Sequence, residues 1–365
     1  MGYFQKEFVE NRKWLESETY SDLVALCQFL PGPSSSQVGM AIGLLRAGVS
    51  GSIAAWLGFT LPSALALITL GLGISHFDLN LHTSTLHGLK LVATAVIAQA
   101  IWSMARNHCA EFKKILIALI SAATILVIPS SFNQVAVIAI SAVMGILILN
   151  TQTTFYESHL PITVNKKTGL ILLTIFFTSI LILPLIANET NSYWVDLFAN
   201  FFQTGSLVFG GGHVVLPLLQ AQVVPSGWVS NETFLAGYAI AQAVPGPLFT
   251  FAAYLGAVSN QTPSGWLGGS IALIAIFLPS FLLVIGIIPF WNEFKNISLL
   301  KKSMVGVNAS VVGLLMGAFY NPVWINTIFN IKDVVFVIVF YLMLHHLKLA
   351  PWLVILFGAF IGQFI

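Results

Sequence analysis

Two short Pro-Gly-Pro segments interrupt sequence that is otherwise apolar. The first is Pro31-Gly32-Pro33, three residues after Gln28, and the second is Pro245-Gly246-Pro247, three residues after Gln242. Proline has no N–H group and glycine permits a sharp bend, so each segment should end one helix and start another. The new helix would present free N–H groups and the positive end of its dipole, which suits an anion.

Ser34 and Ser35 follow the first turn and could add hydroxyl donors to an anion site. Two helix starts that approach from opposite faces of a membrane could hold a dianion without burying a full countercharge. The alternative is that each turn is a structural kink without a ligand. Recurrence of the turn, each time preceded by a glutamine, favours the binding site.

A third break is Gly210-Gly211-Gly212-His213. Glycines allow a ligand or another helix to approach the backbone closely. His213 could donate a hydrogen bond to an anion or relay a proton. Close helix packing, with His213 bonded to a carbonyl group, explains the same pattern equally well.

Two basic residues are further candidates for contact with an anion. Lys90 lies inside a predicted membrane span, where an ionisable side chain costs about 2.5–3.5 kcal/mol and is functional by default. Its counterpart in the second half of the chain is Asn308, so the two halves would contribute differently. Arg46 closes the first helical hairpin. The alternatives are that Lys90 extends to the membrane surface and that Arg46 is an ordinary cytoplasmic anchor.

The composition places these breaks in a membrane. Of 365 residues, 57% are hydrophobic and only 8% are charged, and the mean hydropathy is +0.89. Soluble domains carry about 25% charged residues. Apolar runs at 53–74, 169–186 and 271–288 are long enough to cross a ~30 Å hydrocarbon core.

Several function classes lack support in the sequence. No G-x-S-x-G, H-E-x-x-H, Walker A or dinucleotide-binding motif is present, so we expect no enzyme, no cofactor and no metal. No basic patch with interleaved aromatic residues predicts binding to nucleic acid. Cys27 and Cys109 form no C-x-x-C motif and are interpreted as free thiols.

The chain is a tandem duplication. Trp14 matches Trp228 and Glu18 matches Glu232 at a constant offset, which also aligns the two Gln-x-x-Pro-Gly-Pro motifs. A slightly larger offset then aligns Leu61-Pro62-Ser63 with Leu278-Pro279-Ser280. We predict a first repeat at 1–150, a connecting segment with a linking helix at 151–197, and a second repeat at 198–365.

The basic residues predict how the repeats are oriented. Lys and Arg collect on the cytoplasmic side of membrane proteins. When the Pro-Gly-Pro segments are treated as helical hairpins, all of the 15 basic residues except Lys90 and Lys332 fall on one side. A single linking span at 169–187 then inverts the second repeat. The predicted fold is an all-α integral membrane protein of two inverted repeats with broken helices, an architecture typical of secondary transporters.

These motifs resemble the chromate transporter (CHR) family. The resembling segments include Gln28–Pro33, Gly43–Gly48, Trp56–Ser63, Phe209–His213, Gln242–Pro247 and Gly306–Ala309. The resemblance implies a two-domain protein that exports chromate across the bacterial inner membrane and confers resistance, with sulfate as a competing analogue. The chain departs from the pattern at its start, because only the second repeat has a Phe-Gly-Gly element, which predicts a truncated N-terminus.

The expected function is secondary transport of chromate. The alternatives are a transporter of sulfate or another oxyanion, an anion channel and a membrane scaffold. A channel would have a continuous polar stripe along several spans, whereas the polar breaks here are isolated. The expected partners are chromate, possible competing sulfate, the lipid bilayer and a second copy of the chain in a homodimer.

Overall fold

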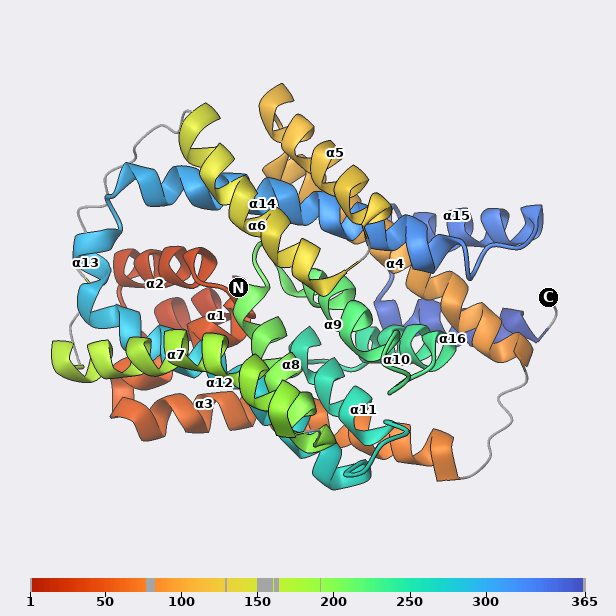
Figure 1. Ribbon diagram of the computed structural model, residues 1–365, viewed down its shortest axis with the longest axis horizontal. Helices are drawn as coiled ribbons and strands as arrows, with labels where there is room; N and C mark the ends of the chain where they lie inside the picture. Colours follow the sequence, from red (N-terminus) through yellow and green to blue (C-terminus); the bar gives the residue numbers. More distant parts are fainter. Residues whose placement is uncertain are drawn as a thin grey trace.

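The structure is a computed structural model that describes residues 2–76, 83–128, 130–149, 160, 164–190 and 192–363. The described part is helical and contains no strand (Figure 1). The first half contains α1 Gly2–Gln5, η1 Lys6–Asn11, α2 Ser17–Phe29, α3 Ser34–His76, α4 Thr83–His108, α5 Phe112–Val127 and α6 Ser131–Ile148. After α7 Lys166–Thr190, the second half contains α8 Tyr193–Leu207, η2 Gly212–Val214, α9 Val215–Val223, α10 Asn231–Ala243, η3 Leu248–Thr250, α11 Phe251–Ala257, α12 Gly265–Ile287, η4 Ile288–Phe290, α13 Trp291–Phe294, α14 Ser298–Ala318, η5 Phe319–Trp324, α15 Ile331–His345 and α16 Pro351–Gly362.

Five helical segments within the described residues are long and apolar enough to cross a membrane. They are Ser34–Gly73, Ser84–His108, Lys166–Thr190, Gly265–Phe294 and Ser298–Trp324. The all-α membrane fold expected from the sequence is therefore confirmed.

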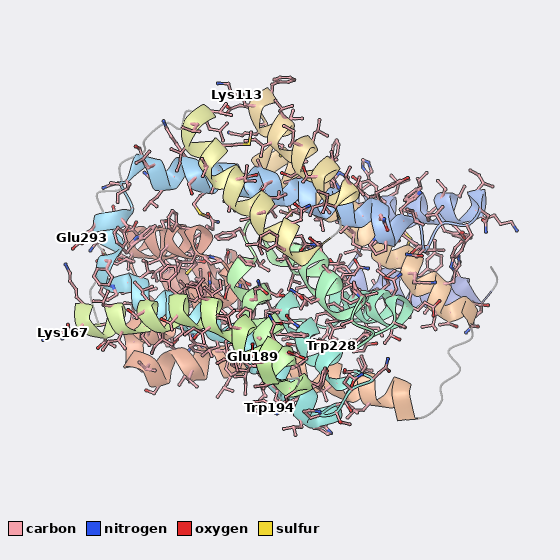
Figure 2. The ribbon with its side chains drawn as sticks, viewed as in Figure 1. Lys113, Lys167, Glu189, Trp194, Trp228 and Glu293 are labelled. Atoms are coloured by element: carbon pink, nitrogen blue, oxygen red, sulfur yellow. The ribbon has the colours of Figure 1, made fainter. Side chains whose placement is uncertain are left out.

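Helix α7 has the length and the exposed apolar surface that such a segment requires. It has 25 residues. At the usual rise of 1.5 Å per residue it is about 37 Å long, which exceeds a ~30 Å hydrocarbon core. Its charged residues Lys167 and Glu189 lie at opposite ends of the helix (Figure 2). Between them, apolar side chains such as Leu181 and Leu185 are exposed on the outer surface.

The helices break at the three predicted places. Helix α2 ends at Phe29 and α3 begins at Ser34; α10 ends at Ala243 and η3 begins at Leu248; α8 ends at Leu207 and η2 begins at Gly212. Gly32, Gly210, Gly211 and Gly246 all have positive φ angles, which explains why glycine is needed at these bends. Helix α3 is also kinked at Ala47 and Gly48, directly after Arg46.

Helices of the first half pack against helices of the second half. Helix α4 of the first half packs on α16 of the second, where Gly88 meets the backbone of Gly358 and Gly362. Helix α14 of the second half packs on α6 of the first, where Gly306 meets the backbone of Ser141 and Gly145 (Figure 1). Because a glycine has no Cβ, the helix backbones approach closely at both crossings.

These two crossings use matched positions. Gly88 aligns with Gly306 at an offset of 218 residues, and an offset of 217 aligns Ser141 with Gly358 and Gly145 with Gly362. Each repeat therefore packs against the other through a pair of related interfaces. The inverted orientation of the repeats and their limits remain predictions.

Candidate functional site

All three helix breaks border one cavity of about 510 Å³. It is lined by Gln28, Pro33, Ser34, Ser35, Asn107, His108, Gly210, Gly211, Gly212, Pro247, Leu248, Phe249 and Asn308. These residues come from α2, α3, α4, η2, η3 and α14 and from the segments between them. The cavity thus brings together parts of both halves that are far apart in the sequence.

The first Pro-Gly-Pro turn is held by hydrogen bonds to both halves. The N–H group of Gly32 donates to the carbonyl of Val208, at an N···O distance of 2.7 Å. Nε2 of the buried Gln37 donates to the carbonyl of Pro31 at 2.6 Å and to Oγ of Ser280 at 3.3 Å. A turn with this many fixed partners keeps the start of α3 in one position against the cavity.

The second Pro-Gly-Pro turn has a matching environment. Gly246 packs directly against the side chain of Ser63, just as Gly32 packs against Ser280. Ser63 and Ser280 are the aligned serines of the two Leu-Pro-Ser motifs. The turn is closed by the hydroxyl of Thr250, which donates to the carbonyl of Pro247 at 2.8 Å. Each turn is therefore supported by the opposite repeat.

The glycine run forms a further wall, with Gly210 next to Asn308. A methyl group added at Gly210 would lie 3.3 Å from Oδ1 of Asn308. That oxygen is buried and has no hydrogen-bond partner among the residues that the structure describes. A polar atom buried without a partner costs free energy unless a ligand or water satisfies it. An amide oxygen only accepts, so a donor such as water would satisfy it. Asn308 is a candidate for contact with an anion because it lines the cavity and its Nδ2 group carries two donors.

His213 and Gln242 lie behind this wall. Nδ1 of His213 is 2.9 Å from the hydroxyl of Tyr238 and 3.5 Å from Nε2 of Gln242. Neither residue lines the cavity. The contact with Tyr238 resembles the packing alternative considered from the sequence, in which the imidazole is bonded within the protein.

Lys90 lies away from the cavity. Its ammonium group is 5.9 Å from the ring centroid of Phe329 and the residue is 8% exposed. His87, one turn earlier, pairs with the buried Asp333 at 2.9 Å. Because α4 is continuous between Lys90 and His108, the rise of 1.5 Å per residue separates them by about 27 Å. The structure does not bring Lys90 and Asn308 together.

Arg46 also lies outside the cavity lining. Its guanidinium group is 5.1 Å from the ring centroid of Trp14, and the side chain is exposed. Pro31, Gly32, Pro245 and Gly246 shape the turns, while Pro33 and Pro247 reach the lining.

Four lining residues were missed by the sequence reasoning: Asn107, His108, Leu248 and Phe249. Asn107 and His108 are a polar pair at the end of an apolar span, and this pattern could have marked them as candidates in the sequence. Leu248 and Phe249 follow the second turn but are apolar, so nothing in their chemistry marks them.

The lining suits an oxyanion. Six of its residues carry hydrogen-bond donors: Gln28, Ser34, Ser35, Asn107, His108 and Asn308. None of the described lining residues has a carboxylate. The N-terminal end of α3 faces the same space, where its first N–H groups lack partners within the helix. The described residues hold no group of three or more His, Cys, Asp or Glu side chains placed to share a metal ion.

The fold and the cavity define a multi-pass membrane protein with broken helices around a polar, donor-rich chamber. A family profile described as chromate transporter matches residues 1–146 and again residues 195–363. The chain belongs to the chromate transporter family. The separate matches in the two halves agree with the duplication seen in the sequence.

Curated relatives are similar over most of their length. An uncharacterized transporter of Methanocaldococcus jannaschii is 25% identical, over 87% of this chain and 77% of the relative. A probable chromate transport protein of Synechococcus elongatus is 26% identical, over 87% and 78%. A chromate transport protein of Cupriavidus metallidurans is 24% identical, over 87% and 76%. No solved structure matches the chain.

Proposed function

We propose that this chain is a secondary transporter that exports chromate from the cytoplasm, and that the 510 Å³ cavity is its oxyanion site. The observation that carries the proposal is the convergence of both Pro-Gly-Pro turns and the glycine run on one chamber with donors and no carboxylate. The family match and the names of the relatives support chromate as the substrate.

The proposed binding mode follows from the charge of the substrate. Chromate is a tetrahedral dianion, and moving it from water into protein requires replacement of its hydrogen bonds. Hydroxyl groups of Ser34 and Ser35 and the amide nitrogen of Asn308 can supply them, together with free N–H groups at the start of α3. Neutral hydrogen-bond donors hold the dianion less tightly than a buried lysine or arginine would, and this favours release as well as binding.

The proposed mechanism is alternating access. Non-helical backbone at the Pro-Gly-Pro and glycine breaks lets the two repeats move against each other while the site stays between them. We propose that the repeats have inverted orientations and that the limits are 1–150, 151–197 and 198–365. No Walker A motif is present in the sequence, so a gradient or a partner would supply the energy.

Sulfate is the second candidate substrate, because it is a dianion of similar shape and the lining carries no group that would separate the two. An anion channel is the alternative mechanism. We propose a bacterial inner membrane as the location, direct contact with lipid, and a homodimer as the assembly.

The test is uptake of radiolabelled chromate into inside-out membrane vesicles from a chromate-sensitive bacterium. Vesicles with the chain should accumulate more chromate than vesicles from cells with an empty vector, and intact cells should accumulate less. Gln28→Ala should reduce uptake because Gln28 lines the cavity, whereas Lys90→Ala and Gln242→Ala test residues outside the lining. Equal chromate contents in expressing and empty cells would refute export.

A further inference from the structure

The oxyanion cavity, of about 510 Å³, contains a side chain that changes charge near neutral pH. Among the described lining residues His108 is the ionisable one, and the others carry amides, hydroxyls, glycine hydrogens, proline rings and apolar groups. Imidazole is the side chain whose ordinary pKa lies between about pH 5 and pH 8. The cavity therefore holds a group that can be neutral or positive, while its other donors keep a constant charge.

The imidazole ring of His108 has no hydrogen-bond partner among the residues that the structure describes. His108 is the last residue of α4. The ring of His213, by contrast, lies 2.9 Å from the hydroxyl of Tyr238. The ring nitrogens of His108 are also not among the buried polar atoms without a partner, which means that water reaches them. Asn107, the adjacent lining residue, is exposed, so the cavity opens beside this ring.

The charged groups closest to His108 along the chain leave no unpaired carboxylate beside it. Lys114, in the first turn of α5, interacts electrostatically with His108. Its Nζ atom donates to Oε1 of Glu111 at 2.7 Å, so these two charges balance each other. Burial raises the pKa of the Cys109 thiol, which therefore stays neutral at physiological pH. Arg106, two residues before His108, is exposed to solvent.

The other helices at the cavity add no unpaired carboxylate either. On α2, the acidic residue closest along the helix to Gln28 is Asp22, whose Oδ2 accepts a hydrogen bond from Nζ of Lys295 at 3.0 Å. Segments η2 and η3 contain no acidic residue. The first two turns of α14 carry two basic residues and no acidic one, and these are Lys301 and Lys302. The negative charge that balances a protonated His108 must therefore come from the ligand.

We infer that His108 contacts the oxyanion and that protonation of its ring sets how tightly the anion is held, an inference that rests on the proposed function of the cavity. A protonated ring offers two N–H donors and a positive charge, whereas a neutral ring offers one donor and one acceptor. A dianion has only acceptors, so it favours the protonated ring. Proton binding and anion binding therefore strengthen each other by the same factor. Loss of the proton then weakens the hold on the anion, a change that a permanently charged arginine would not provide.

The experiment measures equilibrium binding of radiolabelled chromate to the purified full chain in detergent between pH 6 and pH 8.5. Chromate itself gains a proton in this range, but the wild type and His108→Gln meet the same chromate species at each pH, so the ratio of their dissociation constants isolates the side chain. The wild type should bind about tenfold more tightly than His108→Gln at pH 6 and about equally at pH 8.5. His346→Gln, which changes an exposed histidine just after α15, should match the wild type throughout. Elution volume and helix content by circular dichroism check folding.

Proton uptake by the wild type gives a second readout that needs no variant. At pH 7.5 chromate is mainly a dianion, and its binding should take up a measurable fraction of a proton per anion from a weakly buffered solution. A ratio of dissociation constants that stays constant with pH overturns the inference, and so does binding without proton uptake if His108→Gln does not fold. Chromate binding with a constant ratio removes only the role of His108, whereas absence of chromate binding removes the proposed function and this inference with it.

Discussion

The N–H group of Gly32 in the first half donates a hydrogen bond to the carbonyl of Val208 in the second, at 2.7 Å. Gly32 is the centre of the first Pro-Gly-Pro turn, and Val208 is the first residue after α8, two residues before the glycine run. One backbone hydrogen bond therefore joins two of the three helix breaks that border the oxyanion cavity. The position of either break determines the position of the other.

The glycine at the second turn should be intolerant of a side chain. Gly246 has φ of 154°, and an added methyl group would overlap Ser63. We expect Gly246→Ala to lower the free energy of unfolding by roughly 1–3 kcal/mol through strain and overpacking. Ser63→Gly in the same chain should restore part of this loss because it removes the crowding atoms. Thermal unfolding in detergent measures both effects, and strictly additive losses would contradict the contact.

A negative charge in the oxyanion cavity should oppose a dianion. Two like charges 4 Å apart repel by about 4 kcal/mol at an effective dielectric constant of about 20. Asn308→Asp should therefore reduce chromate uptake into inside-out vesicles at least tenfold. Asn296→Asp, at an exposed position before α14, makes the same chemical change away from the cavity and should leave uptake unchanged. Similar uptake in both variants would remove Asn308 from the site.

The three serines at the start of α3 should differ in how strongly their substitution affects chromate uptake, according to whether they line the cavity. Ser34 and Ser35 line the cavity, whereas Ser36 is 2% exposed and is not part of the lining. A hydrogen bond to a charged group contributes about 1.5–3 kcal/mol. Ser34→Ala and Ser35→Ala should each raise the chromate concentration for half-maximal uptake about tenfold or more, and Ser36→Ala should not. An equal response of all three serines would indicate a general effect on α3.

A buried ion pair joins α2 to the segment after α13. Nζ of Lys295 donates to Oδ2 of Asp22 at 3.0 Å, and the residues are 4% and 0% exposed. Removal of one partner leaves a buried charge, which costs about 3–5 kcal/mol. Lys295→Met should therefore destabilise the protein, and the Asp22→Asn/Lys295→Met variant should recover most of the loss. Unfolding midpoints of the wild type, Asp22→Asn, Lys295→Met and the double variant complete the cycle. A double variant as unstable as Lys295→Met would contradict this reasoning.

The sequence allowed prediction of the membrane fold, the helix breaks and most of the cavity lining. Pro33, Gly210 and Pro247 were identified because proline restricts the backbone and glycine permits bends, whatever the rest of the chain does, and Ser34 was identified because it follows such a bend. The duplication strengthened the prediction because the Gln-x-x-Pro-Gly-Pro motif occurs in both repeats. These features depend on covalent geometry and on composition, which the sequence contains directly.

The tertiary structure decided which candidates meet. Lys90 and Asn308 occupy aligned positions, yet only Asn308 lines the cavity, because Lys90 lies about 27 Å along α4 from the end that reaches it. His213 directly follows the glycine run that lines the cavity, yet it is not part of the lining and pairs with Tyr238. Nothing in the sequence indicated that Gln134 of α6 and Gln220 of α9 line one cavity of about 350 Å³. Such positions result from packing between helices of opposite repeats, where contact depends on long-range geometry and not on the identity of neighbouring residues.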